Sequence, residues 1–163
     1  MVAGVGNIFL GDDGFGVEVA RRLAGRELPA GISVRDFGIR GIHLAYQLLD
    51  GFDTLILVDA LARGEAPGTL YVFEPDTEDL PVPDAETFLD AHSLDPASVL
   101  AMVRLLGGKL GRAVVVGCEP GAMEEGIGLS AAVERAVDEA VLLVQQMLAS
   151  QPREEEKGTC SRG

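Results

Sequence analysis

Apolar residues along the chain follow two alternating patterns. Short apolar runs, typical of strands, occur at residues 1–5, 32–38, 54–61, 68–75 and 112–120. Between and after them, apolar residues spaced three or four positions apart predict helices at 14–27, 43–51, within 93–108 and at 130–148. Strands alternating with helices are typical of an α/β protein whose helices cover both faces of a sheet. We therefore expect a three-layer α/β domain with a central, mostly parallel, five-stranded sheet.

Two features of the strand pattern refine this expectation. The runs at 54–61 and 68–75 follow one another with no helix between them, so we expect one antiparallel pair and a mixed sheet. The first run, which begins at Met1, is short for a strand of such a sheet. We expect either that Met1 is not the native start or that a few residues have been lost from the beginning of this strand.

The last residues lack both patterns. Residues 151–163 are polar, aperiodic and nearly neutral in net charge. We therefore expect a single α/β domain over residues 1–150, followed by a disordered tail over 151–163.

Composition narrows the possible partners. The chain has 13 Lys and Arg against 26 Asp and Glu, for a formal net charge of −13. Such a charge repels nucleic-acid phosphates and anionic membranes, so we expect neither as a partner. No apolar run has the length of a membrane span, and the two cysteines, Cys118 and Cys160, form no disulfide framework. These features favour a cytoplasmic protein.

Candidate chemistry lies after the predicted strands, where open parallel sheets bind their ligands. Asp12 and Asp13 lie in the glycine-rich stretch GVGNIFLGDDGFG, Asp59 ends the apolar run at 54–61, and His92 precedes a predicted helix. Asp12 fits the N-cap of the helix that follows it, which leaves Asp13 free to point elsewhere. A carboxylate at the end of a buried run, such as Asp59, is costly unless it is paired or ligated. His92 taken alone fits a loop or cap residue better than a ligand.

Two carboxylates and an imidazole fit more than one chemistry. They can ligate a borderline divalent metal such as nickel, zinc or iron, or provide a general base. A phosphate-binding loop would need a nearby Lys or Arg, and the sequence has none between Val2 and Ala20. No Ser or Cys is paired with a His in a familiar nucleophilic arrangement, so Cys118 is interpreted as a core or pocket-lining thiol.

The stretch GVGNIFLGDDGFG, together with LILVDAL, AHSLDPASVL, and VGCEP followed by GIGLS, resembles the maturation endopeptidases of [NiFe] hydrogenases. The resemblance extends from Val2 to about Leu148 and implies a monomer with a phosphorylase/hydrolase-like three-layer fold. It further implies removal of a C-terminal peptide from the hydrogenase large subunit after nickel insertion. The metal-contacting and catalytic positions of the family fall on Asp13, Asp59 and His92. The nickel then belongs to the substrate, and we expect no tightly bound cofactor.

The resemblance leaves several points open. Hydrolysis can use the nickel as a Lewis acid or a carboxylate as a general base. Gly41 falls where relatives also carry glycine, which fits either a close backbone approach in the cleft or an ordinary turn before a helix. His43 is expected to be a surface or capping residue. Two alternative functions remain: a non-catalytic metal chaperone or docking module for the immature subunit, and a nucleoside- or nucleotide-handling enzyme.

Overall fold

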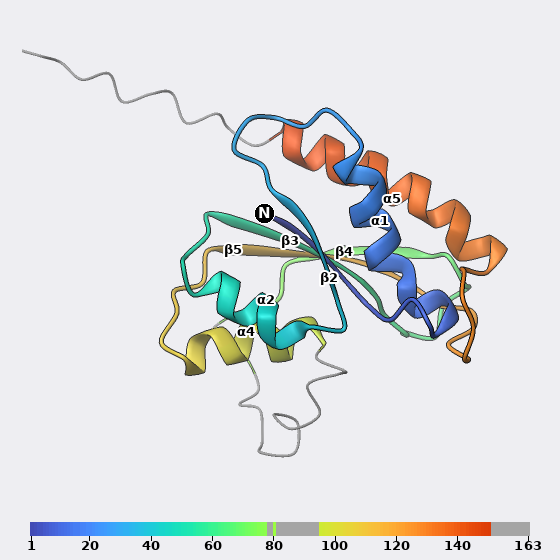
Figure 1. Cartoon of the computed structure of the whole chain (residues 1–163), viewed down its shortest axis with the longest axis horizontal. Helices are drawn as coiled ribbons and strands as arrows, with labels where there is room; N and C mark the ends of the chain where they lie inside the picture. The colour runs from blue at the N-terminus through green and yellow to red at the C-terminus, as the bar shows by residue number, and fades with distance from the viewer. Residues whose placement is uncertain (78–79, 81–94, 151–163) are drawn as a thin grey trace, which may run out of the picture.

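The computed structural model describes residues 1–77, 80 and 95–150, and within them the predicted five-stranded sheet is confirmed (Figure 1). His92 and the predicted tail at 151–163 lie outside the described residues. The strands are β1 (Val2–Val5), β2 (Val34–Gly38), β3 (Thr54–Ala60), β4 (Leu70–Phe73) and β5 (Arg112–Cys118). The helices are the short 3₁₀ helix η1 (Gly11–Gly14), α1 (Phe15–Ala24), α2 (Gly41–Leu48), α4 (Pro96–Leu105) and α5 (Ala131–Ala149).

The sheet is mixed, as the sequence predicts. Its strand order is β2-β1-β3-β5-β4, and β4 alone of these strands runs antiparallel to its neighbour, with Leu70 opposite Cys118. The chain passes from β1 to β2 on one side and then returns to β3 on the other side of β1. The carboxyl ends of β1 and β3 therefore flank a topological switch point, the place where such sheets bind ligands.

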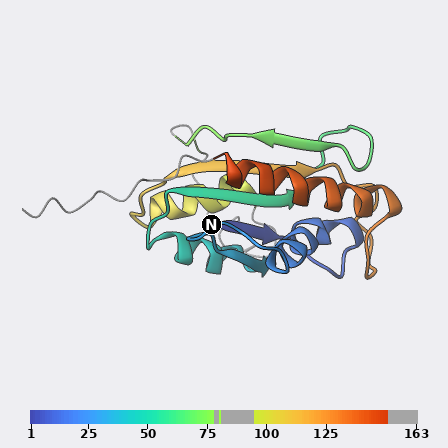
Figure 2. The same cartoon turned by 90° about the horizontal axis from the view of Figure 1, so that it is seen from above.

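Alternating residues of β3 divide the core into two halves. Ile56 and Val58 pack toward α1 and α5, whereas Leu55 and Leu57 pack toward α2 and α4. Figures 1 and 2 show these two helix pairs on opposite faces of the sheet. The three-layer prediction is therefore confirmed, with the inner strands β1, β3 and β5 buried on both faces as their apolar sequences require.

Two glycines bring the start of α1 onto the sheet. A Cβ atom on Gly16 would lie 2.1 Å from the Val58 carbonyl oxygen and 2.4 Å from that of Val5. A Cβ on Gly4 would lie 2.1 Å from the carbonyl oxygen of Gly16. These glycines therefore allow close backbone packing between α1, β1 and β3. As a result, η1 and the residues it carries lie next to the end of β3.

No helix in the described part of the chain is long and apolar enough to cross a membrane.

Candidate active site

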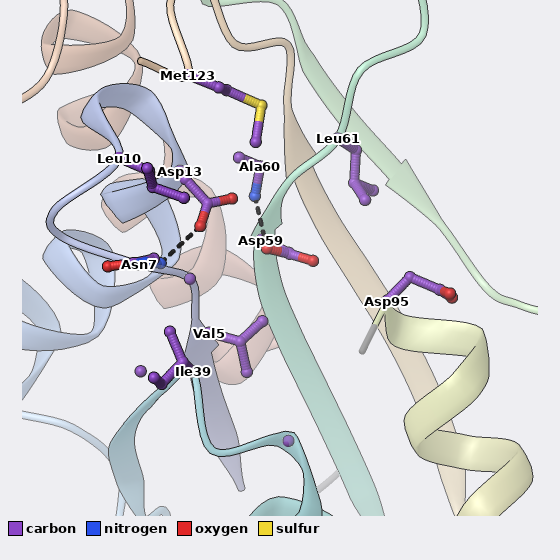
Figure 3. Close-up of a pocket in the computed structure, with 13 residues that line it drawn as sticks. Val5, Asn7, Leu10, Asp13, Ile39, Asp59, Ala60, Leu61, Asp95 and Met123 are labelled. Atoms are coloured by element: carbon purple, nitrogen blue, oxygen red, sulfur yellow. Dashed lines mark hydrogen bonds between the residues drawn. The ribbon is translucent and has the colours of Figure 1, made fainter. Parts of the chain in front are cut away.

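A pocket of about 280 Å³ opens at the switch point between β1 and β3 (Figure 3). Carboxylates and apolar side chains share its lining. The described lining residues are Val5, Gly6, Asn7, Leu10, Asp13, Gly38, Ile39, Gly41, Asp59, Ala60, Leu61, Asp95 and Met123. None of these residues is basic, so the described part of the pocket holds acidic groups without a cationic partner.

Asp13 reaches the pocket from η1. The backbone N–H of Asn7 donates a hydrogen bond to Asp13 Oδ2 at 2.7 Å. Burial raises the pKa of Asp13, although the Asn7 hydrogen bond acts in the opposite direction. A carboxylate of the chain itself therefore already takes one backbone N–H of the glycine-rich turn, the Asn7 amide.

Asp59 reaches the same pocket from the end of β3. Asp59 is 8% exposed, and its Oδ1 accepts a hydrogen bond from the Ala60 N–H at 2.8 Å. Burial raises the pKa of Asp59 well above its usual value, and the nearby negative charge of Asp13 raises it further. The structure therefore brings Asp13 and Asp59, 46 positions apart in the sequence, into one electrostatically coupled pair.

Asp95 is a third carboxylate of the pocket, and sequence reasoning missed it. Asp95 is the N-cap of α4: its Oδ1 accepts hydrogen bonds from the N–H groups of Ala97 (2.8 Å) and Ser98 (3.2 Å). Its Oδ2 accepts one from Ser98 Oγ at 2.7 Å. An Asp directly before Pro at a helix start is a capping signal that could have located this residue. Because capping occupies both oxygens, Asp95 is less available to a ligand than Asp13 or Asp59.

The prediction that Asp12 caps the following helix is wrong. The N-cap of α1 is Gly14, because η1 lies between β1 and α1 and moves the helix start beyond Asp12. Asp12 is instead fully buried and accepts hydrogen bonds from Gly121, Ala122 and Ser130. Burial alone would raise the pKa of Asp12, but these hydrogen bonds outweigh it and lower that pKa.

The three secondary candidates, Gly41, His43 and Cys118, lie in different surroundings. Gly41 begins α2, two residues before the predicted helix start, and lines the pocket. His43 is exposed on α2 and does not line the pocket, which confirms the surface interpretation. Cys118 is buried in the core, and burial raises the pKa of its thiol to about 12, which disfavours the reactive thiolate at neutral pH.

Asp13 and Asp59 can perform two kinds of chemistry. Carboxylates with raised pKa values can hold or accept a proton near neutral pH, and they can also ligate a divalent cation. The described residues contain no cluster of three or more potential metal ligands. That Asp13, Asp59 and His92 together contact a metal stays a prediction, because His92 falls outside the described residues.

A mostly parallel, doubly covered sheet with coupled carboxylates at its switch point defines an α/β protein with an acidic pocket suited to hydrolytic or cation-dependent chemistry. The model of one family, described as "Hydrogenase maturation protease", matches residues 17–147. The chain therefore belongs to the hydrogenase maturation proteases, which are endopeptidases.

Individual relatives agree with this assignment. The chain is 32% identical to the hydrogenase 2 maturation protease of Escherichia coli over 152 residues, covering 92% of this chain and 88% of that protein. It is 33% identical over 143 residues to the hydrogenase expression/formation protein HupD of Rhodobacter capsulatus, covering 86% of this chain and 67% of the relative.

Solved structures confirm the fold class. The hydrogenase maturating endopeptidase HybD of E. coli superposes with a TM-score of 0.72 at 30% identity, covering 91% of this chain and 90% of that one. The hydrogenase 2 maturation peptidase of Thaumarchaeota archaeon SCGC_AB-539-E09 gives 0.70 at 31% identity, covering 92% and 97%.

Proposed function

We propose that this endopeptidase removes a C-terminal peptide from the large-subunit precursor of a [NiFe] hydrogenase after nickel insertion. In this proposal, Asp13, Asp59 and His92 contact the nickel that the precursor carries. The observation that carries the proposal is the placement of two coupled carboxylates in one pocket that has no basic residue among its described lining. Relatives named as hydrogenase maturation proteases support the choice of substrate.

The electrostatics of the pocket favour a cationic ligand. Asp59 is buried, and its ionised form is disfavoured both by burial and by the charge of Asp13. A divalent cation between the two carboxylates would reverse both effects, because it favours the ionised form of each. Nickel accepts carboxylate and imidazole ligands. A precursor that carries nickel would therefore bind in this pocket more tightly than a nickel-free precursor.

The pocket also supports the hydrolytic step. Asn7 fixes one oxygen of Asp13, and within the described residues no hydrogen bond engages its Oδ1. That oxygen can accept a proton from water as the water attacks the scissile carbonyl. The alternative is that the substrate's nickel polarises the carbonyl as a Lewis acid while the carboxylates only hold it. Both routes need Asp13 and Asp59 in their observed positions.

The first experiment compares nickel-loaded and nickel-free precursor. Each is incubated with the protein, and the mass of the large subunit is followed over time. We expect cleavage of the loaded precursor only. Equal cleavage of both forms would contradict nickel recognition, and cleavage of neither would contradict the proposed substrate.

The second experiment tests the proposed residues. We expect Asp13→Asn and His92→Ala each to abolish processing while leaving a folded protein. His43→Ala is the matched control, because His43 is the other histidine of the chain and is exposed outside the pocket. Normal processing by His92→Ala would remove His92 from the proposed site.

The family match also bears on the alternative that the protein is a metal chaperone without protease activity. A docking module without activity would use the same carboxylates to bind the immature subunit. Membership in a protease family favours cleavage, and the mass measurement distinguishes the two, since a chaperone would bind loaded precursor and leave its mass unchanged.

A further inference from the structure

Asp12 contacts a part of the chain that is distant in sequence. Its Oδ2 accepts hydrogen bonds from the N–H groups of Gly121 (2.7 Å) and Ala122 (2.9 Å) and from Ser130 Oγ (2.9 Å). Its Oδ1 accepts one from the Ser130 N–H at 2.6 Å. Both oxygens of a fully buried carboxylate are thus used to hold one loop, residues 121–130, and the start of α5.

Backbone hydrogen bonds join the same two segments. The Asp12 N–H donates to the Ala122 carbonyl at 2.9 Å, and the Gly11 N–H donates to the Gly126 carbonyl at 3.0 Å. The Gly126 N–H donates in return to the Phe9 carbonyl at 2.9 Å. We refer to residues 9–14 and 121–130 together as the junction, with the Asp12 carboxylate at its buried centre.

The junction carries residues of two pocket walls. Asp13 follows Asp12 directly, and Met123 follows Ala122 directly; both side chains line the pocket (Figure 3). The Met123 side chain is nearly half exposed and lies on the pocket without a backbone hydrogen bond of its own among those described. The neighbouring residue Ala122 is held by two hydrogen bonds to Asp12, one in each direction.

We propose that Asp12 is a positioning residue for precursor processing, and this inference rests on the proposed function. Asp12 does not contact the pocket; by holding loop 121–130 against the turn at 9–14, it fixes Met123 and Asp13 at the separation that the substrate requires. Small displacements of positioned groups can cost large factors in rate. A purely stabilising Asp12 would instead leave the rate of the folded enzyme unchanged.

Asp12→Asn tests this with little change of shape. An amide has one acceptor oxygen, so its NH₂ group must face either the Ser130 N–H or the amides of Gly121 and Ala122, donor against donor. Ser130→Ala is a milder variant that removes the hydroxyl donor and keeps the charge of Asp12. The matched control is Glu119→Gln, because Glu119 is also a buried carboxylate that accepts backbone N–H bonds, from Arg63 and Gly64, and none of these three residues lines the pocket.

Processing of nickel-loaded precursor is measured at limiting and saturating precursor, at a temperature where circular dichroism shows every variant folded. We expect Asp12→Asn to lower kcat by about 10-fold or more, Ser130→Ala by a smaller factor, and Glu119→Gln to match wild type. Wild-type kcat in folded Asp12→Asn, or an equal loss in Glu119→Gln, would overturn the proposal. If wild type itself fails to process the precursor, the proposed function is wrong, and this outcome is distinct from either result.

A double-mutant cycle tests the route through Met123. If Asp12 acts by placing Met123, then Met123→Ala in the Asp12→Asn background should cost less than Met123→Ala alone in wild type. If the double variant loses kcat/KM by the product of the two single-variant factors, Asp12 does not act through Met123.

Discussion

Asp12 and Asp13 are adjacent in sequence, yet their carboxylates lie in two different environments. At the junction, Asp12 is fully buried and accepts hydrogen bonds at both oxygens, and its pKa is lowered. In the pocket, Asp13 accepts one described hydrogen bond, Asp59 lies nearby, and the pKa of each is raised. Burial acts on all three groups, so the supply of donors decides the sign of the shift. Several hydrogen-bond donors hold the Asp12 carboxylate in a structural role. Asp13 and Asp59 each accept one described hydrogen bond, so their other oxygens can interact with a cation or a proton.

The largest effect is expected from Asp59→Asn in the pocket. We expect processing of nickel-loaded precursor to fall by about 100-fold or more, because a general base or metal ligand is lost. In the same variant the free protein should melt at a higher temperature, because a buried charge has been removed. Mass spectrometry of the large subunit and a thermal melt measure the two effects. A variant that loses activity because it melts earlier would contradict the contrast between pocket and junction.

At the junction we expect the opposite result for stability. Asp12→Ala leaves buried backbone donors without an acceptor, which costs about 1–3 kcal/mol in the free energy of unfolding. Urea denaturation of Asp12→Ala and wild type gives this difference. Asp50→Ala, at an exposed aspartate, is the control and should remain within about 0.5 kcal/mol of wild type. Similar stabilities for the two variants would mean that the hydrogen bonds of Asp12 do not stabilise the fold.

The pH dependence of stability should separate the two environments. The pKa values of Asp13 and Asp59 are raised above 3.8 in the folded state, so between 3.8 and those values the folded protein binds more protons than the unfolded one. Stability of the free protein should therefore rise from neutral to mildly acid pH, by at most about 1.4 kcal/mol per pH unit for each group.

Asp12 gives the opposite sign. Because its pKa is lowered, the stability that Asp12 contributes is complete above pH 3.8 and is lost only as the pH falls through the folded-state pKa.

Urea denaturation between neutral and mildly acid pH measures the rise in stability that Asp13 and Asp59 cause. We expect this rise to be smaller in Asp59→Asn than in wild type. An unchanged rise would show that Asp59 does not titrate as described.

The smallest effect is expected at Glu119, another buried carboxylate that accepts several hydrogen bonds. The Tyr71 hydroxyl donates a hydrogen bond to Glu119 Oε2, and backbone N–H groups of Arg63 and Gly64 donate as well. Tyr71→Phe removes one donor of several, so we expect a loss of about 0.5–1.5 kcal/mol in urea denaturation and no change in processing rate. A loss of processing without a loss of stability would mean that Tyr71 takes part in the reaction and does not only stabilise the fold.

Sequence patterns were sufficient for the sheet and for part of the site. Strand runs and helix periodicity predicted the layers, and the rule that ligands bind beyond strand ends selected Asp13 and Asp59 as candidates. The family resemblance assigned the two residues to one site, and both line the same pocket. The partner of Asp12 could not be predicted, because Ser130 lies 118 positions away and no local pattern links the two. Met123 was missed for the same reason: its place in the pocket depends on the path of a loop that has no periodicity.

The most direct test of the central claim, that the paired carboxylates recognise the substrate's nickel, is a binding measurement. Affinities of the Asp13→Asn/Asp59→Asn double variant and of wild type are measured for nickel-loaded and for nickel-free precursor. We expect wild type to bind the loaded precursor more tightly, and the double variant to bind both forms with the weak affinity that wild type shows for the nickel-free form. A double variant that retains the full preference for loaded precursor would contradict the account.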